Sequence, residues 1–365
     1  MNSPASAMRA LFATFALMTG VAASVQAQPK DFTLYGTVDL AVRRSSGLTP
    51  EHIPSRASHT GLTSGVADTS HWGVRGISPL GNSQSVVFQL ESGLRADTGS
   101  SEDSGTYFNR SSWIGLQAPW GRLTAGRHDT LLAQSLLSID PLARRMPDLN
   151  PNVTIAALGM HGLPGDFGNT GTAGNAYQLN DSLLYTGRSG AYTTGIMYGF
   201  GEQAGGHSRS ASAGLSLMWE EDGATLGGAY QRFKDADGRA LNAWIIGTAY
   251  RSGNVRIAAS AARQDADTGA AERTRQHVYS LGTTWSPTQQ SDWTLAYYRV
   301  TREQPFANTT EKDGFQRFVL LAQYRLSHRT RLYSAFDLTQ WRHGYQGLGN
   351  KRRANGISVG MQYRF

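Results

Sequence analysis

Residues able to perform acid–base or nucleophilic chemistry are scattered along this chain. Nine histidines are present, and no two of them have the His-x-x-x-His spacing that places two metal ligands on one helix face. A hydrolase needs a nucleophile, a base and an orienting acid that converge at one place. The glycine-rich stretch 165–174 is not followed by the Lys-Ser/Thr pair of a phosphate-binding loop. We therefore expect neither catalysis nor a bound metal or cofactor.

The charged side chains instead follow a period of two. In the segment 32–43, Leu34 and Val38 alternate with Asp39 and Arg43. One apolar and one polar face are typical of a strand that separates two unlike solvents. Most such segments run about 9–12 residues, the length that a tilted strand needs to cross a bilayer. The sixteen predicted strands are about 32–43, 70–78, 84–96, 107–117, 121–128, 180–187, 191–200, 209–219, 224–234, 240–251, 255–264, 275–285, 291–302, 315–326, 330–341 and 353–365.

The connections between these strands alternate in length. Tight turns such as 118–120 and 327–329 follow even-numbered strands, and most connections after odd-numbered strands are longer. Long loops on one side and tight turns on the other are typical of an outer-membrane barrel. The eight tryptophans lie within or at the ends of predicted strands, as in aromatic girdles at a lipid interface. The same rings would suit the core of a soluble sandwich, which has no reason to segregate its loops by length. The long connections are 44–69, 97–106, 129–179, 265–274, 303–314 and 342–352.

The first residues have the pattern of a secretory signal peptide. Arg9 is followed by the apolar run 10–21 and by small residues that end in Val25-Gln26-Ala27. We predict a signal peptide at 1–27 and a barrel domain at 28–365. A buried N-terminal helix is the alternative, but the apolar run has the length of a signal sequence and is too short to span a bilayer.

Composition narrows the possible partners. The chain has no Cys, so an exported form depends on packing and backbone pairing rather than on disulfides. The net charge of +7 is compatible with nucleic acid, but export and the dispersal of Arg over many strands disfavour that partner. A basic lumen that attracts anions fits the same charge. No run of about 18 apolar residues follows the signal, so we expect no transmembrane helix.

These patterns predict an all-β fold, a 16-stranded antiparallel transmembrane β-barrel. Backbone amides in hydrocarbon need partners, so the last strand must pair with the first. Sixteen strands leave room for an aqueous channel. Alternation then assigns the side chains that face the lumen, with Trp113 facing lipid. The assigned lumen residues are Tyr35, Thr37, Asp39, Arg43, His71, Arg75, Gln89, Glu91, Arg95, Arg110, Ser112, Arg317, Arg325, Arg331 and Asp337.

Several short stretches, in this order and spacing, resemble the Gram-negative general porins, especially their β-proteobacterial branch. The resemblance extends from Asp31 to Phe365 and is patchy in the loops. The matching stretches are Thr33-Leu34-Tyr35-Gly36-Thr37-Val38-Asp39, Trp72-Gly73-Val74-Arg75-Gly76, Phe88-Gln89-Leu90-Glu91-Ser92-Gly93, Phe108-Asn109-Arg110, Gly121-Arg122-Leu123-Thr124-Ala125-Gly126-Arg127 and Tyr324-Arg325-Leu326-Ser327-His328-Arg329.

The resemblance implies partners and a loop arrangement. It implies a homotrimer in the outer membrane, in contact with lipids and lipopolysaccharide. It implies that the third long loop, about 129–179, folds inward and narrows the channel; an irregular connection of this length is unusual unless it is functional. The terminal Phe365 resembles the family's assembly signal, which the barrel-insertion machinery reads.

The resemblance also implies a constriction with opposed charges. In similar porins a basic cluster on the wall faces acidic groups on the inward loop. Carried over to this chain, the basic residues are Arg75, Arg110 and Arg127, and the acids are Asp140 and Asp148. Strict alternation would place Arg127 outward, so an inward Arg127 requires a local irregularity near Gly126.

We predict an outer membrane porin that passes small hydrophilic solutes and ions by passive diffusion, since such a pore works by its size and its fixed charge. A mild anion preference follows from the net charge and from the excess of Arg in the lumen set. The alternative is that these charges are merely solvated. A solute-specific channel, a non-conducting adhesive or structural barrel, and an outer-membrane enzyme are the other functions that we considered.

Overall fold

The structure of the protein is a computed structural model. It describes residues 31–50, 52–156, 167–168, 177–201, 209–267, 273–303 and 312–365. The predicted signal peptide at 1–27 and the predicted domain start at 28 lie outside the described residues, as does part of the predicted loop 129–179.

The described part of the chain contains seventeen strand segments and three short helices. None of these helices is long and apolar enough to cross a membrane. The helices are α1 (Leu131–Ile139), the 3-10 helix η1 (Pro147–Leu149) and α2 (Pro151–Ala156). The strands are β1 (Asp31–Leu48), β2 (Pro54–Ser64), β3 (His71–Gly81), β4 (Gln84–Gly93), β5 (Ser111–Ala118), β6 (Gly121–Asp129), β7 (Gln178–Ser189), β8 (Tyr192–Gly199), β9 (Ser212–Glu221), β10 (Ala224–Lys234), β11 (Ala240–Ser252), β12 (Val255–Asp267), β13 (Arg273–Trp285), β14 (Ser291–Glu303), β15 (Asp313–Arg325), β16 (Thr330–Arg342) and β17 (Arg353–Arg364).

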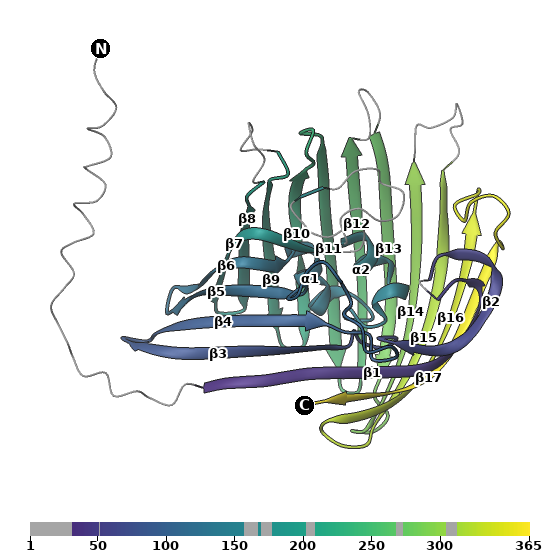
Figure 1. The fold of residues 1–365 in the computed structure, drawn as a ribbon, viewed down its shortest axis with the longest axis horizontal. Helices are drawn as coiled ribbons and strands as arrows, with labels where there is room; N and C mark the ends of the chain where they lie inside the picture. The colour runs from purple at the N-terminus through teal and green to yellow at the C-terminus, as the bar shows by residue number, and fades with distance from the viewer. Residues whose placement is uncertain are drawn as a thin grey trace, which may run out of the picture. The chain divides into compact units, whose positions relative to one another are not determined.

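Antiparallel pairing curls these strands into a sheet whose two ends meet (Figure 1). From β3 to β17 each strand pairs with the next one along the chain. The seam is the pairing of β1 with β17, where Val42 lies opposite Val359. The first and last strands of the barrel are therefore joined, as hydrocarbon surroundings require.

The second position of the barrel is shared by β2 and β3. β2 pairs with the segment of β1 from Leu40 to Leu48, and β3 pairs with its first residues, Asp31 to Thr37. Seventeen segments therefore make sixteen positions around the barrel. The predicted 16-stranded antiparallel barrel is confirmed.

The prediction that residues 44–69 form a loop is wrong. β1 continues to Leu48, and the whole of β2 lies inside that range. β2 contains a single large apolar side chain, Leu62, so it lacks the alternation that marks a lipid-facing strand. Its pairing with β1 uses backbone groups, which leave no such pattern in the sequence.

Between β2 and β3 the chain leaves the wall and enters the interior. In the segment Gly65–Ser70, the Ala67 carbonyl accepts a hydrogen bond of 3.0 Å from the Met146 amide. The Asp68 carboxylate accepts a hydrogen bond of 3.1 Å from the Arg364 guanidinium on β17. The interruption of the second strand thus connects the loop after β6 to the seam of the barrel.

The two faces of the sheet differ as the alternation predicts. On β11, Ile246 and Tyr250 are 53% and 56% exposed, whereas Ala243 and Ile245 are buried. Exposed apolar side chains recur in this way on strand after strand. An apolar surface of this extent is a liability in water but suits contact with lipid chains.

Helix α1 fills part of the interior. Its N-cap is Thr130, whose side chain accepts a first-turn amide hydrogen bond. Leu131, Leu136 and Ile139 are completely buried, and the helix contacts β8 to β12. The helix approaches β11 closely at Gly247, since a Cβ there would come within 2.8 Å of the Ile139 Cβ. Apolar packing therefore fixes the helix to the inner face of the barrel.

The irregularity that an inward Arg127 requires is present in β6. Gly126 has a φ of +135°, and the register between β6 and β7 shifts between Gly126 and His128. A Cβ at Gly126 would collide with the Ser112 carbonyl oxygen, so glycine is required there. Beyond this bulge Arg127 is buried and donates a hydrogen bond of 2.6 Å to the Asn109 carbonyl. The predicted irregularity near Gly126 is confirmed.

The predicted orientation of the fourth strand is wrong. β5 begins four residues later than the predicted segment 107–117. Trp113 lies opposite Gln89 and stacks on the His128 ring, with centroids 6.0 Å apart. Trp113 therefore faces the interior, and Ser112 faces the lipid side. The error arose from treating Trp113 as a lipid-facing residue, although tryptophan has a polar edge that suits either side.

We expect Gly126→Ala to destabilise the barrel by about 2 kcal/mol or more, because alanine is strained at this φ and its Cβ overlaps the β5 backbone. Urea unfolding in lipid vesicles, followed by tryptophan fluorescence, measures the change. Gly105→Ala is the control, since Gly105 has its nearest neighbouring atom 3.4 Å from an added Cβ. Equal stability of the two variants would contradict the role of the bulge.

Candidate functional site

The chain after β6 packs on the inner wall of the barrel. We call residues 130–156, which contain α1, η1 and α2, the interior segment. They are most of the described part of the predicted loop 129–179, of which residues 157–166 and 169–176 lie outside the described residues. Polar bonds and buried apolar contacts both join the interior segment to the wall.

Asp140 is the principal anchor of the interior segment. Its carboxylate is completely buried and accepts hydrogen bonds from the Leu142 amide, from Asn150 and from Asn152, at 2.8–2.9 Å. The Tyr298 hydroxyl on β14 lies 3.2 Å from both carboxylate oxygens. Burial raises the pKa of Asp140, and these donors oppose the rise without cancelling it. Asp140 therefore joins two parts of the interior segment to the wall.

Three arginines add polar bonds between the interior segment and the wall. Two of the bonds end on backbone carbonyls, which arginine can reach with its fixed fork of donors. The contacts are Arg145 with Gln323 Oε1 at 2.6 Å and with Thr294 Oγ1 at 3.1 Å, Arg256 with the Ser138 carbonyl at 2.6 Å, and Arg317 with the Leu149 carbonyl at 3.1 Å.

A cavity of about 960 Å³ lies between the interior segment, the wall and the neighbouring loops. This volume is at the upper end of the range for small-molecule sites. Five arginines and three acids line it, so arginines outnumber acids in its lining. The charged lining residues are Arg95, Arg110, Arg127, Arg302 and Arg317 with Glu102, Asp103 and Asp148.

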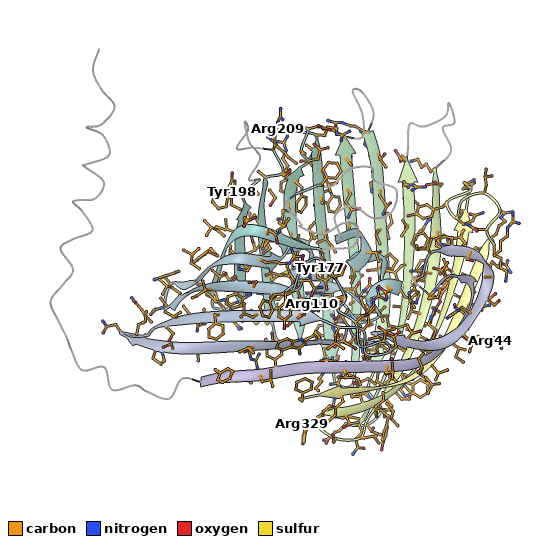
Figure 2. All side chains as sticks on the ribbon, viewed as in Figure 1. Arg44, Arg110, Tyr177, Tyr198, Arg209 and Arg329 are labelled. Atoms are coloured by element: carbon orange, nitrogen blue, oxygen red, sulfur yellow. The ribbon has the colours of Figure 1, made fainter. Side chains whose placement is uncertain are left out.

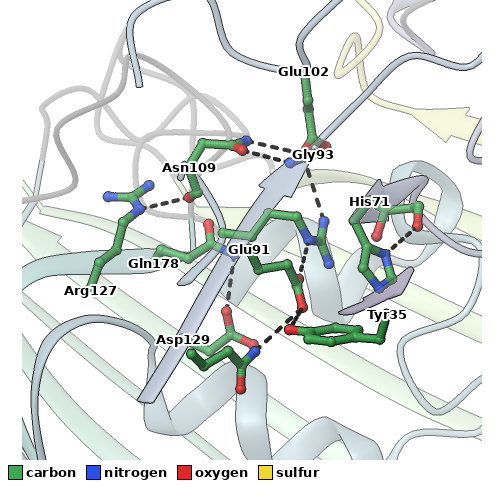
Figure 3. Close-up of polar contacts among 12 residues, drawn as sticks. Tyr35, His71, Glu91, Gly93, Glu102, Asn109, Arg127, Asp129 and Gln178 are labelled. Carbon is green, nitrogen blue, oxygen red and sulfur yellow. Dashed lines mark hydrogen bonds and ion pairs between the residues drawn. The ribbon is translucent and has the colours of Figure 1, made fainter. Parts of the chain in front are cut away.

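Arg110 is held at the cavity wall by two carboxylates, those of Glu91 and Glu102, which Figure 3 labels. Its Nε lies 2.6 Å from Glu91 Oε1, and its NH1 lies 3.7 Å from Glu102 Oε2. The Tyr35 hydroxyl donates a hydrogen bond of 2.8 Å to the other oxygen of Glu91. Glu91 is buried, whereas Glu102 is partly exposed. The charge of Arg110 is therefore largely balanced where it stands.

Arg127 binds neutral oxygens. Besides the Asn109 carbonyl, its NH1 donates a hydrogen bond of 2.6 Å to Asn180 Oδ1. Next to it, Arg144 of the interior segment forms an ion pair of 2.7 Å with Asp129 and lies 4.7 Å over the Tyr177 ring. Through these contacts Arg144 of the interior segment and Tyr177, the residue before β7, are held at the end of β6.

The structure brings part of the predicted constriction together. Arg110, Arg127, Arg317 and Asp148 all line the cavity. The Asp148 side chain is 58% exposed, whereas Asp140 lies beneath the surface in its own hydrogen-bond network. The two predicted loop acids therefore occupy different environments, one in the open cavity and one in the packing below it.

Asp39 and Arg43 lie buried in the wall near the seam. The Tyr333 hydroxyl donates a hydrogen bond of 2.7 Å to Asp39, and Arg43 forms an ion pair of 2.8 Å with Asp337. Each charge thus has its partner on the inner face of β16. This pairing lets the inner wall carry charged residues without exposing them to the lumen.

Arg75, His71, Arg325 and Arg331 lie along the inner wall outside the cavity lining. The Arg75 guanidinium is 5.1 Å over the Tyr35 ring, and the His71 ring meets the same tyrosine edge-on at 6.3 Å. Arg331 lies directly opposite Arg325 in the pairing of β15 with β16. Phe365 continues the seam, since its amide and carbonyl pair with Gly36.

Several residues that shape the site had no signal in the sequence. Tyr298 and Asn152 resemble any other polar residue of a strand or a loop, and Asp68 lies in the range predicted as loop 44–69.

Gly356–Gly360 has the Gly-x-Ser-x-Gly spacing of a nucleophile elbow. It lies within β17, however, where Ser358 accepts a hydrogen bond of 3.0 Å from Arg43.

These features define a class of protein. A closed antiparallel sheet carries apolar side chains outward and charged side chains inward, around a cavity lined in part by the interior segment. Arg209 and Arg329 mark the two opposite ends of the barrel, whereas Arg110 and Tyr177 lie between them (Figure 2). The class is a transmembrane β-barrel channel.

A family model described as Gram-negative porin matches residues 13–343, which is most of the chain. The chain therefore belongs to the Gram-negative porin family. It is an outer membrane barrel, and porins are channels for passive diffusion rather than enzymes.

Individual relatives agree with this assignment. An outer membrane porin protein of Bordetella pertussis is 34% identical over 152 residues, and the match spans 39% of this chain and only 39% of that protein. The major outer membrane protein P.IB of Neisseria meningitidis serogroup A is 26% identical over 92% of this chain and 94% of that protein. The solved structure of an anion-selective porin from Comamonas acidovorans has a TM-score of 0.74 at 22% identity, over 92% of this chain and 100% of that one. The similarity to this solved porin structure shows that the two proteins share a fold.

We expect Asp140→Ala to release the interior segment. The substitution leaves the donors of Asn150, Asn152 and Tyr298 without an acceptor, at a cost of about 1–3 kcal/mol for each one that stays buried. The expected result is noisier single-channel current and at least about tenfold faster proteolysis within residues 130–156. Asp148→Ala is the matched control, since that carboxylate is exposed. If the Asp140→Ala channel had the same current noise and the same rate of proteolysis as the unmodified protein, Asp140 would not anchor the interior segment.

Proposed function

We propose that the protein is a pore with a mild preference for small hydrophilic anions. The observation that carries the proposal is the charge of the cavity, where five arginines face three acids. Fixed charge of one sign in a low-dielectric channel raises the local concentration of the opposite ion. The narrowest part of the path lies, in this proposal, between the interior segment and the Arg110 and Arg127 side of the wall.

A second group of positive charges supports the same preference. Arg325 and Arg331 lie opposite each other, and Arg364 is on the inner face of the adjoining strand near them. Like charges directly opposite in a sheet are destabilising. Only Arg364 of the three forms an ion pair with an acid within the described residues, the pair with Asp68. Positive charges that lie so close together are expected along a path for anions, because a passing anion reduces their repulsion.

We also propose a homotrimer. A patch of three rings on the outer surface supports it: Tyr107 and Phe108 pack edge-to-face at 4.9 Å, and both lie 6.4 Å from Trp72. Tyr107 is 70% exposed, so a neighbouring copy has an aromatic surface to cover. Single-channel steps that open in threes would support the trimer, and uniformly single steps would oppose it.

Reversal potentials in a KCl gradient test the ion preference. We expect the unmodified channel to give the sign of an anion-preferring pore. Arg331→Glu reverses one charge of the lumen group and is expected to move the reversal potential toward cations.

Arg44→Glu is the matched control for this substitution. It changes the net charge by the same amount, but Arg44 is exposed on the outer side of β1 (Figure 2). We expect it to leave the reversal potential unchanged. A cation-preferring unmodified channel, or equal shifts in the two variants, would rule out the proposed role of the lumen charges. A barrel that inserts and never conducts would rule out the pore itself.

A further inference from the structure

Three aromatic rings line one part of the cavity. Phe315 on β15 packs edge-on against Trp341 on β16, with centroids 4.9 Å apart, and against Tyr345, at 5.3 Å. Trp341 and Tyr345 are nearly parallel, with centroids 5.8 Å apart. We call these three residues the aromatic cluster. All three belong to the lining of the cavity.

Polar atoms at the aromatic cluster lack partners. Within the described residues, four lining side chains carry buried polar atoms that form no hydrogen bond. Buried polar groups in native proteins are almost always satisfied, and each exception calls for a bound molecule or another explanation. The atoms are Trp341 Nε1, the Tyr345 hydroxyl, Gln346 Oε1 and both ring nitrogens of His52.

At neutral pH most of these groups are donors. Burial raises the pKa of Tyr345 to about 12, so its hydroxyl keeps its proton. Burial, together with the charges of Arg43 and Arg317, lowers the pKa of His52 to about 3, so its imidazole is neutral and offers one N–H. The nearest carboxylate oxygen of Asp148 is 3.6 Å from His52 Nδ1, too far for a hydrogen bond.

Arg317 brings a buried positive charge to the same place. It is 4% exposed and donates to Thr339 Oγ1 at 2.8 Å and to the Leu149 carbonyl, both of which are neutral. It forms no ion pair with a carboxylate of the described residues. Arg302 differs, because its guanidinium lies 4.2 Å over the Tyr345 ring but is paired with Asp313. A buried cation whose hydrogen bonds end on neutral oxygens favours a bound anion.

The remaining lining is apolar on the neighbouring segments. Ile53 and Pro54 come from the connection into β2, and Val153 comes from α2 of the interior segment. These side chains and the Phe315 ring offer contacts to a flat apolar group. A cavity with convergent donors, a buried arginine and apolar side chains in its lining is typical of a site for a small organic acid.

We propose that this part of the cavity binds aromatic monocarboxylates. The carboxylate accepts hydrogen bonds from Arg317, Trp341 and Tyr345, and the ring packs against Phe315 and Ile53. An inorganic anion would leave the apolar surface without a partner, and a neutral aromatic would offer no negative charge to Arg317. The inference rests on the proposed anion preference only in that an anionic solute has to reach the cavity.

Benzoate block of single-channel current tests the proposal. Benzoate, acetate and benzamide are added in turn to the purified full-length channel in KCl at constant ionic strength. We expect benzoate to interrupt the current, and acetate and benzamide to need at least about tenfold higher concentrations, since each lacks one of the two recognised features. Equal potency of benzoate and acetate would overturn the proposal in favour of a plain anion path, and equal potency of benzoate and benzamide would overturn the role of Arg317.

Substitutions that remove one polar atom locate the site. Trp341→Phe removes the indole N–H, and Tyr345→Phe removes the hydroxyl. Each is expected to weaken benzoate block about three- to tenfold, the loss of one hydrogen bond. Trp285→Phe is the control, because Trp285 is 50% exposed at the end of β13 and is outside the cavity lining.

The outcomes separate this proposal from the proposed ion preference. Unchanged block in both Trp341→Phe and Tyr345→Phe would remove the aromatic cluster from the site, whatever the reversal potential. A pore without anion preference that is still blocked selectively by benzoate would refute the proposed preference and keep the binding site. If Trp341→Phe fails to fold, Tyr345→Phe alone decides.

Discussion

Within the hydrocarbon layer every backbone amide and carbonyl must find a partner in the chain, and the seam between β1 and β17 is where this requirement is completed. The rest of the molecule depends on that closure. A closed sheet has an outside that only lipid touches and an inside that lipid never reaches. The charges of Arg43, Asp39 and Asp337 can therefore be buried in the wall at the seam, where each has a partner.

The same constraint explains how much of the fold the sequence reveals. Lipid on one side and polar groups on the other impose the period of two, which is why sixteen positions could be counted before any coordinates. The pattern is missing in β2, whose one large apolar side chain is Leu62, so the sequence does not predict that strand. At Trp113 the pattern misled, because an aromatic ring is accepted on both faces, and only its stacking on His128 decides the side.

The site was predictable to the extent that it depends on strand alternation. Arg317 follows from the period of two, and Arg127 follows once Gly126 is recognised as a bulge. Arg110 contacts Glu91 from just before the start of β5, so the alternation of that strand does not explain its position. The difference between Asp140 and Asp148 did not follow, because both are acids on one loop. What separates them is Tyr298 on β14, more than a hundred residues further along the chain, and a contact of that kind leaves no mark near either acid.

The contacts of the interior segment depend on the curling of the sheet. Met146 binds Ala67, in the second position of the barrel, whereas Asp140 and Arg145 bind β14 and β15 near the other end of the chain. These two regions become neighbours of the same segment only when the sheet has curled round. The segment therefore has its full set of partners only in the curled sheet, so the cavity that it lines is completed together with the wall.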